Sequence, residues 1–94
     1  LPISGGLSGP AIKPIAVRMV YQAANAVSIP VIGMGGIACA EDALEFILAG
    51  ASAVSIGTAN FFNPYAAEET VQGIEAYMRE KKVDRLTDLI GIVK

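Results

Sequence analysis

Short apolar runs alternate with longer segments of helical periodicity along this chain. The runs Val31–Met34 and Ala53–Ile56 show no polar alternation, which is typical of parallel strands buried on both faces. Around them, apolar positions recur every three or four residues and predict helices. The predicted helices begin near Ile12 and span Ala40–Ala49, Tyr65–Lys82 and Leu86–Val93, with a short helical turn at Ala59–Phe62.

The same periodicity predicts which side of each helix is buried. In the first helix the apolar stripe consists of Ile15, Met19, Val20, Ala23 and Val27. In the second helix it consists of Leu44, Ile47 and Leu48. In the long helix it consists of Val71, Ile74, Ala76, Tyr77 and Met78.

Strands that alternate with helices predict an α/β fold with parallel pairing and right-handed crossovers. Two such strands do not make a stable sheet, because both faces of a parallel sheet must be covered. A (β/α)8 barrel needs roughly 200 residues or more, whereas this chain has 94. We therefore expect residues 1–94 to be a single partial domain, the carboxyl-terminal portion of a TIM barrel with its last two strands and their helices. The start at Leu1 rather than methionine favours the same interpretation.

Glycines follow both predicted strands, as Gly35–Gly36 and as Gly57–Thr58. A glycine lets the backbone approach a ligand closely, and the rim at the carboxyl ends of barrel strands is where such folds hold phosphate. The alternative interpretations are a tight turn that needs positive φ and a threonine that caps a helix. Gly9, before the first helix, would lie on the same rim or simply punctuate a loop. Together these residues predict a site for a phosphate-bearing cofactor.

Composition excludes several other classes of function. The net charge of −2, without a basic stripe, argues against nucleic-acid binding. No histidine is present and we expect no metal site. The uncharged stretches Met19–Ala40 and Phe46–Ala67 are long enough for membrane spans but are broken by proline and glycine, so we expect no membrane insertion. The lone Cys39 fits a reducing compartment, which favours the cytoplasm.

A few polar residues deserve separate interpretation. Lys13 could reach a phosphate or a partner subunit, but a solvated side chain is the expectation. Glu41, Asp42 and Glu45 are expected to form a solvated helix face without a basic partner. Cys39 is expected to be structural rather than catalytic, because the adjacent carboxylates disfavour a nucleophilic thiolate.

Four strings of sequence resemble one known family. They are GGLSGPAIKP at 5–14, IGMGGI at 32–37, AGASAV at 49–54 and IGTANF at 56–61. In this order and spacing they closely resemble the carboxyl-terminal part of class 1 dihydroorotate dehydrogenase, over nearly the whole chain. The LSGP variant at 7–10 is most similar to the catalytic subunit of class 1B, the NAD-linked form.

The resemblance implies an FMN-binding (β/α)8 barrel that oxidises (S)-dihydroorotate to orotate in pyrimidine (UMP) biosynthesis. By matched position, Gly9 would line the FMN, Gly35 and Gly36 would hold its phosphate, and Gly57 and Thr58 would complete the cradle. The family's catalytic cysteine and substrate-contacting residues would lie upstream, so no catalytic residue is expected here and the chain alone should be inactive.

Class 1B further implies a homodimer and a second subunit, with FAD and a 2Fe-2S cluster, that passes electrons to NAD in a heterotetramer. Three alternatives stay open from the sequence. One is the FMN domain of a dihydropyrimidine dehydrogenase-like protein, and another is a flavin-free barrel enzyme that binds a phosphosugar. The third is a non-enzymatic remnant of such an enzyme.

Overall fold

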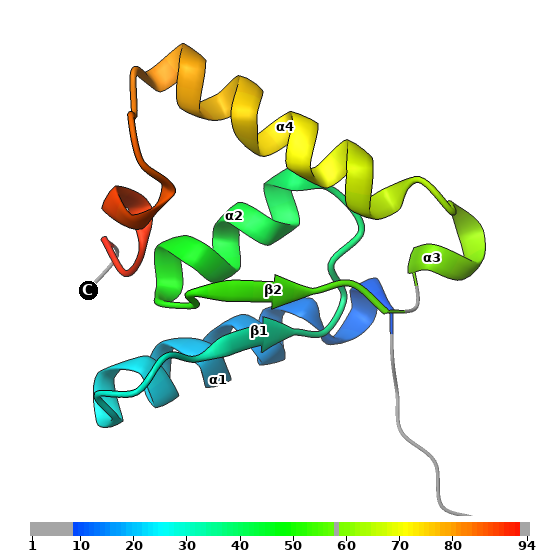
Figure 1. The fold of residues 1–94 in the computed structure, drawn as a ribbon. Helices are drawn as coiled ribbons and strands as arrows, with labels where there is room; N and C mark the ends of the chain where they lie inside the picture. The colour runs from blue at the N-terminus through cyan, green and yellow to red at the C-terminus, as the bar shows by residue number, and fades with distance from the viewer. Residues whose placement is uncertain (1–8, 58, 93–94) are drawn as a thin grey trace, which may run out of the picture.

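A computed structural model of the chain describes residues 9–57 and 59–92. Two parallel strands, four α-helices and two 3-10 helices follow one another in the order that the sequence predicts (Figure 1). In chain order these elements are η1 (Pro10–Ile12), α1 (Lys13–Ala26), β1 (Ile32–Met34), α2 (Ala40–Ala49), β2 (Ala53–Ser55), α3 (Ala59–Phe62), α4 (Ala66–Lys81) and η2 (Leu86–Leu89).

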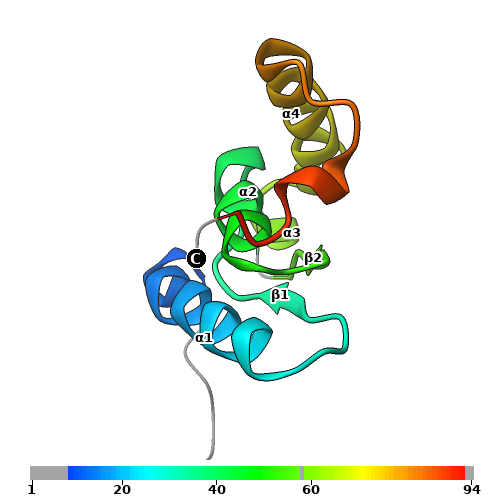
Figure 2. The ribbon, with the colours of Figure 1, turned by 90° about the vertical axis from the view of Figure 1, so that its left-hand side faces the viewer.

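The two strands pair in parallel, as predicted, with Gly33 opposite Val54 at the centre of the register. Both helices that flank β1, α1 and α2, lie on one side of this sheet (Figure 2). α4 packs against α2 on the side away from α1, so that α2 lies between α1 and α4 (Figures 1 and 2). This is the right-handed β–α–β arrangement that parallel pairing requires.

The expectation that both faces of the sheet are buried is wrong for the described chain. Ile32 and Met34 of β1 are 66% and 65% exposed, while Gly33 between them is buried toward the helices. On β2, Ala53 and Ser55 are likewise exposed. The reason is that successive side chains of a strand point to opposite faces, and only the helical face has a covering layer within residues 9–57 and 59–92.

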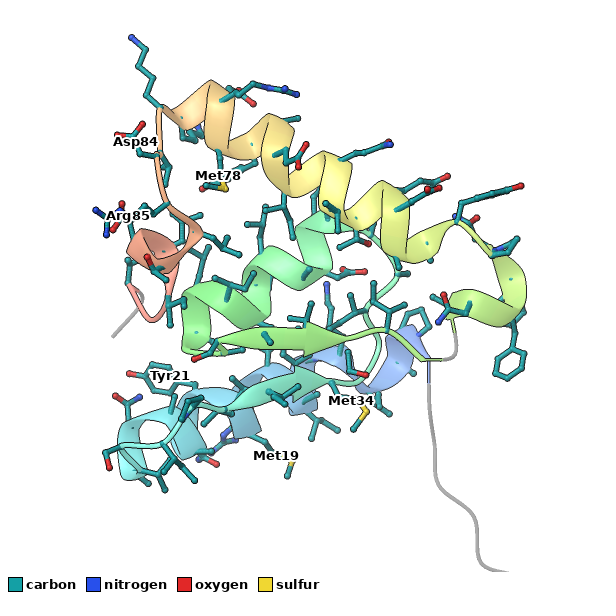
Figure 3. All side chains as sticks on the ribbon, in the orientation of Figure 1. Met19, Tyr21, Met34, Met78, Asp84 and Arg85 are labelled. Carbon is teal, nitrogen blue, oxygen red and sulfur yellow. The ribbon has the colours of Figure 1, made fainter. Side chains whose placement is uncertain are left out.

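The prediction of the buried face of α1 is also wrong. The helix buries a neighbouring face, rotated about its axis from the predicted one. Ile15 and Met19 are 64% and 63% exposed, and of the predicted stripe only Val20 is buried. Figure 3 shows Met19 extending from α1 away from the rest of the molecule. The helix instead turns Ala16, Val17 and Tyr21 to the core, and the small side chain of Ala16 lets it approach Gly35 of the β1–α2 turn.

The core is centred on α2, whose bounds agree with the prediction. Phe46, which the predicted stripe omitted, is fully buried between the sheet and the flanking helices. Leu44 and Ile47 face α4 and the carboxyl-terminal segment, as predicted. α4 crosses α2 closely at Gly73, where an added Cβ would fall 2.4 Å from the Cβ of Ala40. On α4 itself, Ile74, Tyr77 and Met78 pack inward but Val71 is exposed, contrary to the prediction.

The predicted tail helix is a shorter 3-10 helix, η2, and its predicted end at Val93 lies outside the described residues. Leu89 of η2 is 6% exposed and packs against Leu44 and Ile47. The N–H of Gly91 donates to the carbonyl of Ile47, which fastens the segment to α2. Within the described part of the chain, no helix has the length and apolar character needed to cross a membrane.

Candidate functional site

The carboxyl ends of both strands open onto one small cavity. Its volume is about 140 Å³, and stretches of chain from three separate regions line it. They are Gly9 and Pro10 before α1, Gly36, Ile37 and Ala38 after β1, and Ala59, Phe62 and Asn63 after β2. Figure 1 shows how η1, the β1–α2 turn and α3 gather at this end of the sheet.

The volume of the cavity is sufficient for a small chemical group such as a phosphate. A cavity of about 150 Å³ can also accommodate a benzene molecule, so volume alone does not distinguish an anion from a small organic group. None of the lining residues carries a charged side chain. Recognition there would rest on backbone N–H groups and on the positive amino end of α2, which suits a phosphate.

The predicted site residues divide into three groups. Gly9 and Gly36 line the cavity together, although 26 residues lie between them in the chain. Gly35 and Gly57 lie at the ends of the two strands but are not part of its lining. Thr58 lies outside the described residues.

The β1–α2 turn depends on its glycines for conformation and for space. Gly35 and Gly36 have φ of 125° and 76°, a region that side chains with a Cβ rarely adopt. A Cβ on Gly36 would fall 2.9 Å from the carbonyl oxygen of Gly9 and 2.8 Å from the Cβ of Lys13. The tight-turn interpretation is therefore confirmed for this pair, and the turn lies directly against the start of α1.

The third wall is formed by α3 and Asn63, which leads into α4. The side-chain oxygen of Asn63 accepts a hydrogen bond from the N–H of Tyr65 at 3.0 Å, and its amide donates to Glu69 at 2.9 Å. Asn63 thus closes the turn before α4, whose N-cap is Tyr65, and is held in place by its own neighbours. Phe62 reaches the cavity from α3 although it is 84% exposed overall.

An ion-pair cluster joins α1 to α2 next to the β1–α2 turn. The ammonium of Lys13 is 2.7 Å from Asp42 Oδ1 and 2.5 Å from Glu45 Oε2. The other carboxylate oxygen of Asp42, Oδ2, accepts a hydrogen bond from the N–H of Ala38 at 3.0 Å. The expectations of a solvated Lys13 and of carboxylates without a basic partner are therefore wrong, because folding brings α1 and α2 together at this point.

The electrostatics of the cluster agree with this geometry. Burial acts to raise the pKa of Asp42, but hydrogen bonds from Lys13 and from the N–H of Ala38 outweigh it and leave that pKa below its usual 3.8. Hydrogen bonds to Asp42 and Glu45 raise the pKa of Lys13 well above its usual value. Both groups are charged at neutral pH, and each compensates the other.

Other groups of potential chemical interest are not drawn into the cavity. Cys39 is exposed at the N-cap of α2 and is absent from the cavity lining. Sequence reasoning missed Pro10, Ile37, Ala38, Ala59, Phe62 and Asn63 as lining residues. Their only sequence signal is position: each lies within a few residues of a predicted glycine.

Comparison with known proteins identifies the family. The family model described as dihydroorotate dehydrogenase matches residues 1–78. The chain belongs to the dihydroorotate dehydrogenase family.

Curated dihydroorotate dehydrogenases resemble this chain over almost its whole length. It is 66% identical over 91 residues to the catalytic subunit of dihydroorotate dehydrogenase B (NAD(+)) from Lachnoclostridium phytofermentans, which covers 97% of this chain and 30% of the relative. The protein of the same name from Alkaliphilus oremlandii is 60% identical over 89 residues, which is 95% of this chain and 30% of the relative. The chain thus spans about 30% of the length of these relatives.

A solved structure extends the comparison to three dimensions. The dihydroorotate dehydrogenase of Eimeria tenella, crystallised in complex with ferulenol, superimposes with a TM-score of 0.86 at 28% sequence identity. The match covers 95% of this chain and 24% of the Eimeria protein. The two strands and their helices therefore form a portion of the dihydroorotate dehydrogenase fold, which explains why one sheet face lacks a covering layer.

Proposed function

We propose that this chain forms the carboxyl-terminal part of a dihydroorotate dehydrogenase barrel and anchors the phosphate of FMN. The enzyme would oxidise (S)-dihydroorotate to orotate in pyrimidine biosynthesis. The observation that carries the proposal is the convergence of three glycine-containing or helix-initiating segments on one small cavity, without charged side chains in its lining, at the carboxyl ends of two parallel strands. Membership of the family supports FMN over other phosphate-bearing ligands.

Each residue of the site has a definite part in this proposal. Gly9 and Gly36, which lie against each other, would let the backbone approach the phosphate closely, and the amino end of α2 would add positive potential. Gly35 would shape the turn through its positive φ. Gly57 and the Thr58 hydroxyl would complete the cradle from the end of β2. A Cβ on Gly57 would meet no atom within 4 Å, so the space beside it is open to a ligand.

FMN, when bound, would supply the hydride-accepting chemistry, and the protein would supply its position and electrostatic surroundings. The cysteine that abstracts the substrate proton would come from the part of the enzyme that the relatives have and this chain does not span. Cys39 would not replace it, because it lies outside the cavity lining. The 94 residues alone would therefore be inactive.

The names of the relatives support a partner for this chain. Both bacterial relatives are called catalytic subunits of the NAD(+)-dependent form. We infer that the enzyme passes electrons to NAD through a second subunit that carries FAD and a 2Fe-2S cluster. The catalytic subunits would pair as a homodimer within a heterotetramer located in the cytoplasm.

A chimaera tests the proposal in a complete barrel. In this chimaeric subunit the chain replaces the matching 91-residue stretch of the Lachnoclostridium phytofermentans catalytic subunit, and the product is co-expressed with the rest of that enzyme. We expect a yellow protein that releases FMN on denaturation and oxidises dihydroorotate. A folded but colourless chimaera that fails to take up added FMN would contradict the proposal and favour a flavin-free phosphosugar-binding site.

A further inference from the structure

Lys13 contacts the β1–α2 turn at two points. Its own backbone lies against Gly36, where an added Cβ would fall 3.0 Å from the Lys13 nitrogen. Its side chain passes to the other end of the turn and pairs with Asp42 at 2.7 Å. Asp42 Oδ2 in turn accepts a hydrogen bond from the N–H of Ala38, with 3.0 Å between nitrogen and oxygen. The cavity-lining residues Gly36, Ile37 and Ala38 are therefore enclosed between the backbone of Lys13 and its ammonium group.

The position of Asp42 creates an electrostatic problem for an anion site. Its carboxylate accepts a hydrogen bond from the backbone N–H of Ala38, which lines the cavity. The Asp42 side chain is only 16% exposed. A poorly hydrated negative charge at that point would repel a phosphate across a short distance of low dielectric. Lys13 is the cation that compensates it. Lys13 also pairs with Glu45, but that side chain is 52% exposed and its charge is therefore better hydrated than that of Asp42. The α1 residue Arg18 lies in a different groove of the surface.

We propose that Lys13 and Asp42 form a positioning clamp for the phosphate-binding turn, in which Asp42 fixes the backbone of Ala38 and Lys13 cancels the charge that Asp42 would otherwise present to the phosphate. The inference rests on the proposed function, because it assigns a role toward the FMN phosphate. Neither residue belongs to the cavity lining. Both act through the turn and are positioning residues rather than catalytic ones.

Riboflavin separates this role from a simple structural one, because it shares the flavin ring of FMN and lacks the phosphate. Dissociation constants of both flavins are measured by quenching of flavin fluorescence on the apo form of the chimaeric subunit. In Lys13→Met we expect FMN binding to weaken on the order of tenfold with riboflavin binding unchanged. In the double variant Lys13→Met/Asp42→Asn we expect most of the FMN affinity to return, since the uncompensated carboxylate is gone.

Two further variants complete the design. Arg18→Met removes one positive charge from α1 outside the clamp and should leave both flavin affinities unchanged. If Lys13→Met does not fold, Asp42→Asn tests the clamp from the other side. Its preference for FMN over riboflavin should rise, because a negative charge beside the turn is removed while Lys13 keeps its positive charge. An unchanged or lower preference would overturn the clamp.

The outcomes distinguish the two proposals. Equal affinities of the unmodified chimaera for FMN and riboflavin would overturn both the phosphate site and the clamp. A clear preference for FMN in the unmodified chimaera that persists in Lys13→Met would overturn the clamp alone. If Lys13→Met loses affinity for FMN and riboflavin equally, and the double variant does not recover it, Lys13 has only a structural role. That result would also overturn the clamp.

Discussion

The backbone of Gly33 in β1 lies directly against the ring of Phe46 in α2. A Cβ on Gly33 would fall 2.6 Å from Phe46 Cδ1, closer than carbon atoms normally approach. Phe46 is completely buried at the centre of the core. The absence of a side chain at position 33 thus allows α2 to approach the sheet.

Replacement of Gly33 by alanine tests this contact. Overpacking of a well-filled core costs about 1–3 kcal/mol, so we expect Gly33→Ala to lower the free energy of unfolding of the chimaeric subunit by that amount. Denaturant titration of the FMN-free protein measures it. Gly57→Ala is the matched control, because a Cβ there meets nothing within 4 Å. Equal stability of the two variants would show that α2 can move away from the sheet without cost.

Gly73 makes an equivalent close contact between two helices. Alanine is normally more favourable than glycine inside a helix by about 1 kcal/mol, yet a Cβ at 73 would fall 2.4 Å from Ala40 Cβ. We expect Gly73→Ala to destabilise the chimaera in thermal unfolding. The compensating pair Gly73→Ala/Ala40→Gly should recover much of the loss, and a single variant more stable than the parent would refute the close crossing.

The elements and their order follow from the sequence because their signals are local. Apolar periodicity, the proline before β1 and the glycine after α2 act within a few residues, and α2 forms over the predicted Ala40–Ala49. The face of α1 does not follow in the same way. Both Ile15 and Val17 are apolar, and the choice between the two sides depends on where Gly35 and Gly50 come close to the helix.

The candidate site likewise contains residues that the sequence predicts and contacts that it does not. Gly9 and Gly36 are predictable, because glycines after strands and before helices mark the rim of a barrel. The ion pair between Lys13 and Asp42 joins residues 29 positions apart, and no local pattern reports a contact of that kind. The placement of Phe62 depends in the same way on the path of the chain after β2.

The uncovered face of the sheet leads to a prediction about the complete barrel. Ile32 is 66% exposed in this chain, but in the family fold that face should meet the remaining strands. We expect Ile32→Asp to destabilise the chimaera by upwards of ~2 kcal/mol, the cost of burying an unpaired polar group. Ile29→Asp, at a 70% exposed loop position, is the control. Similar unfolding midpoints for the two variants would mean that Ile32 stays in water.

The lowered pKa of Asp42 predicts how stability depends on pH. A carboxyl group whose pKa is lower when folded stabilises the protein above its unfolded pKa and loses that contribution as the pH falls through the folded value. The raised pKa of Lys13 keeps its own contribution intact up to about pH 10. The stability difference between the parent chimaera and Asp42→Asn should therefore be constant from about pH 5 to 9. It should begin to fall near the unfolded pKa of about 4 and disappear only once the pH is below the lowered folded pKa. A difference that persists in acid would exclude the ion pair as its source.

The most direct measurement of phosphate anchoring introduces a negative charge into the cavity. Ala38 lines the cavity and is exposed, so Ala38→Asp adds a carboxylate there without disturbing the core. Ser52→Asp adds the same charge at an exposed position just before β2, at the end of the sheet opposite the cavity. The quantity to measure is the ratio of FMN to riboflavin affinity in the chimaeric subunit. Phosphate anchoring predicts that the ratio falls on the order of tenfold or more in Ala38→Asp and is unchanged in Ser52→Asp, whereas an equal ratio in both variants would contradict it.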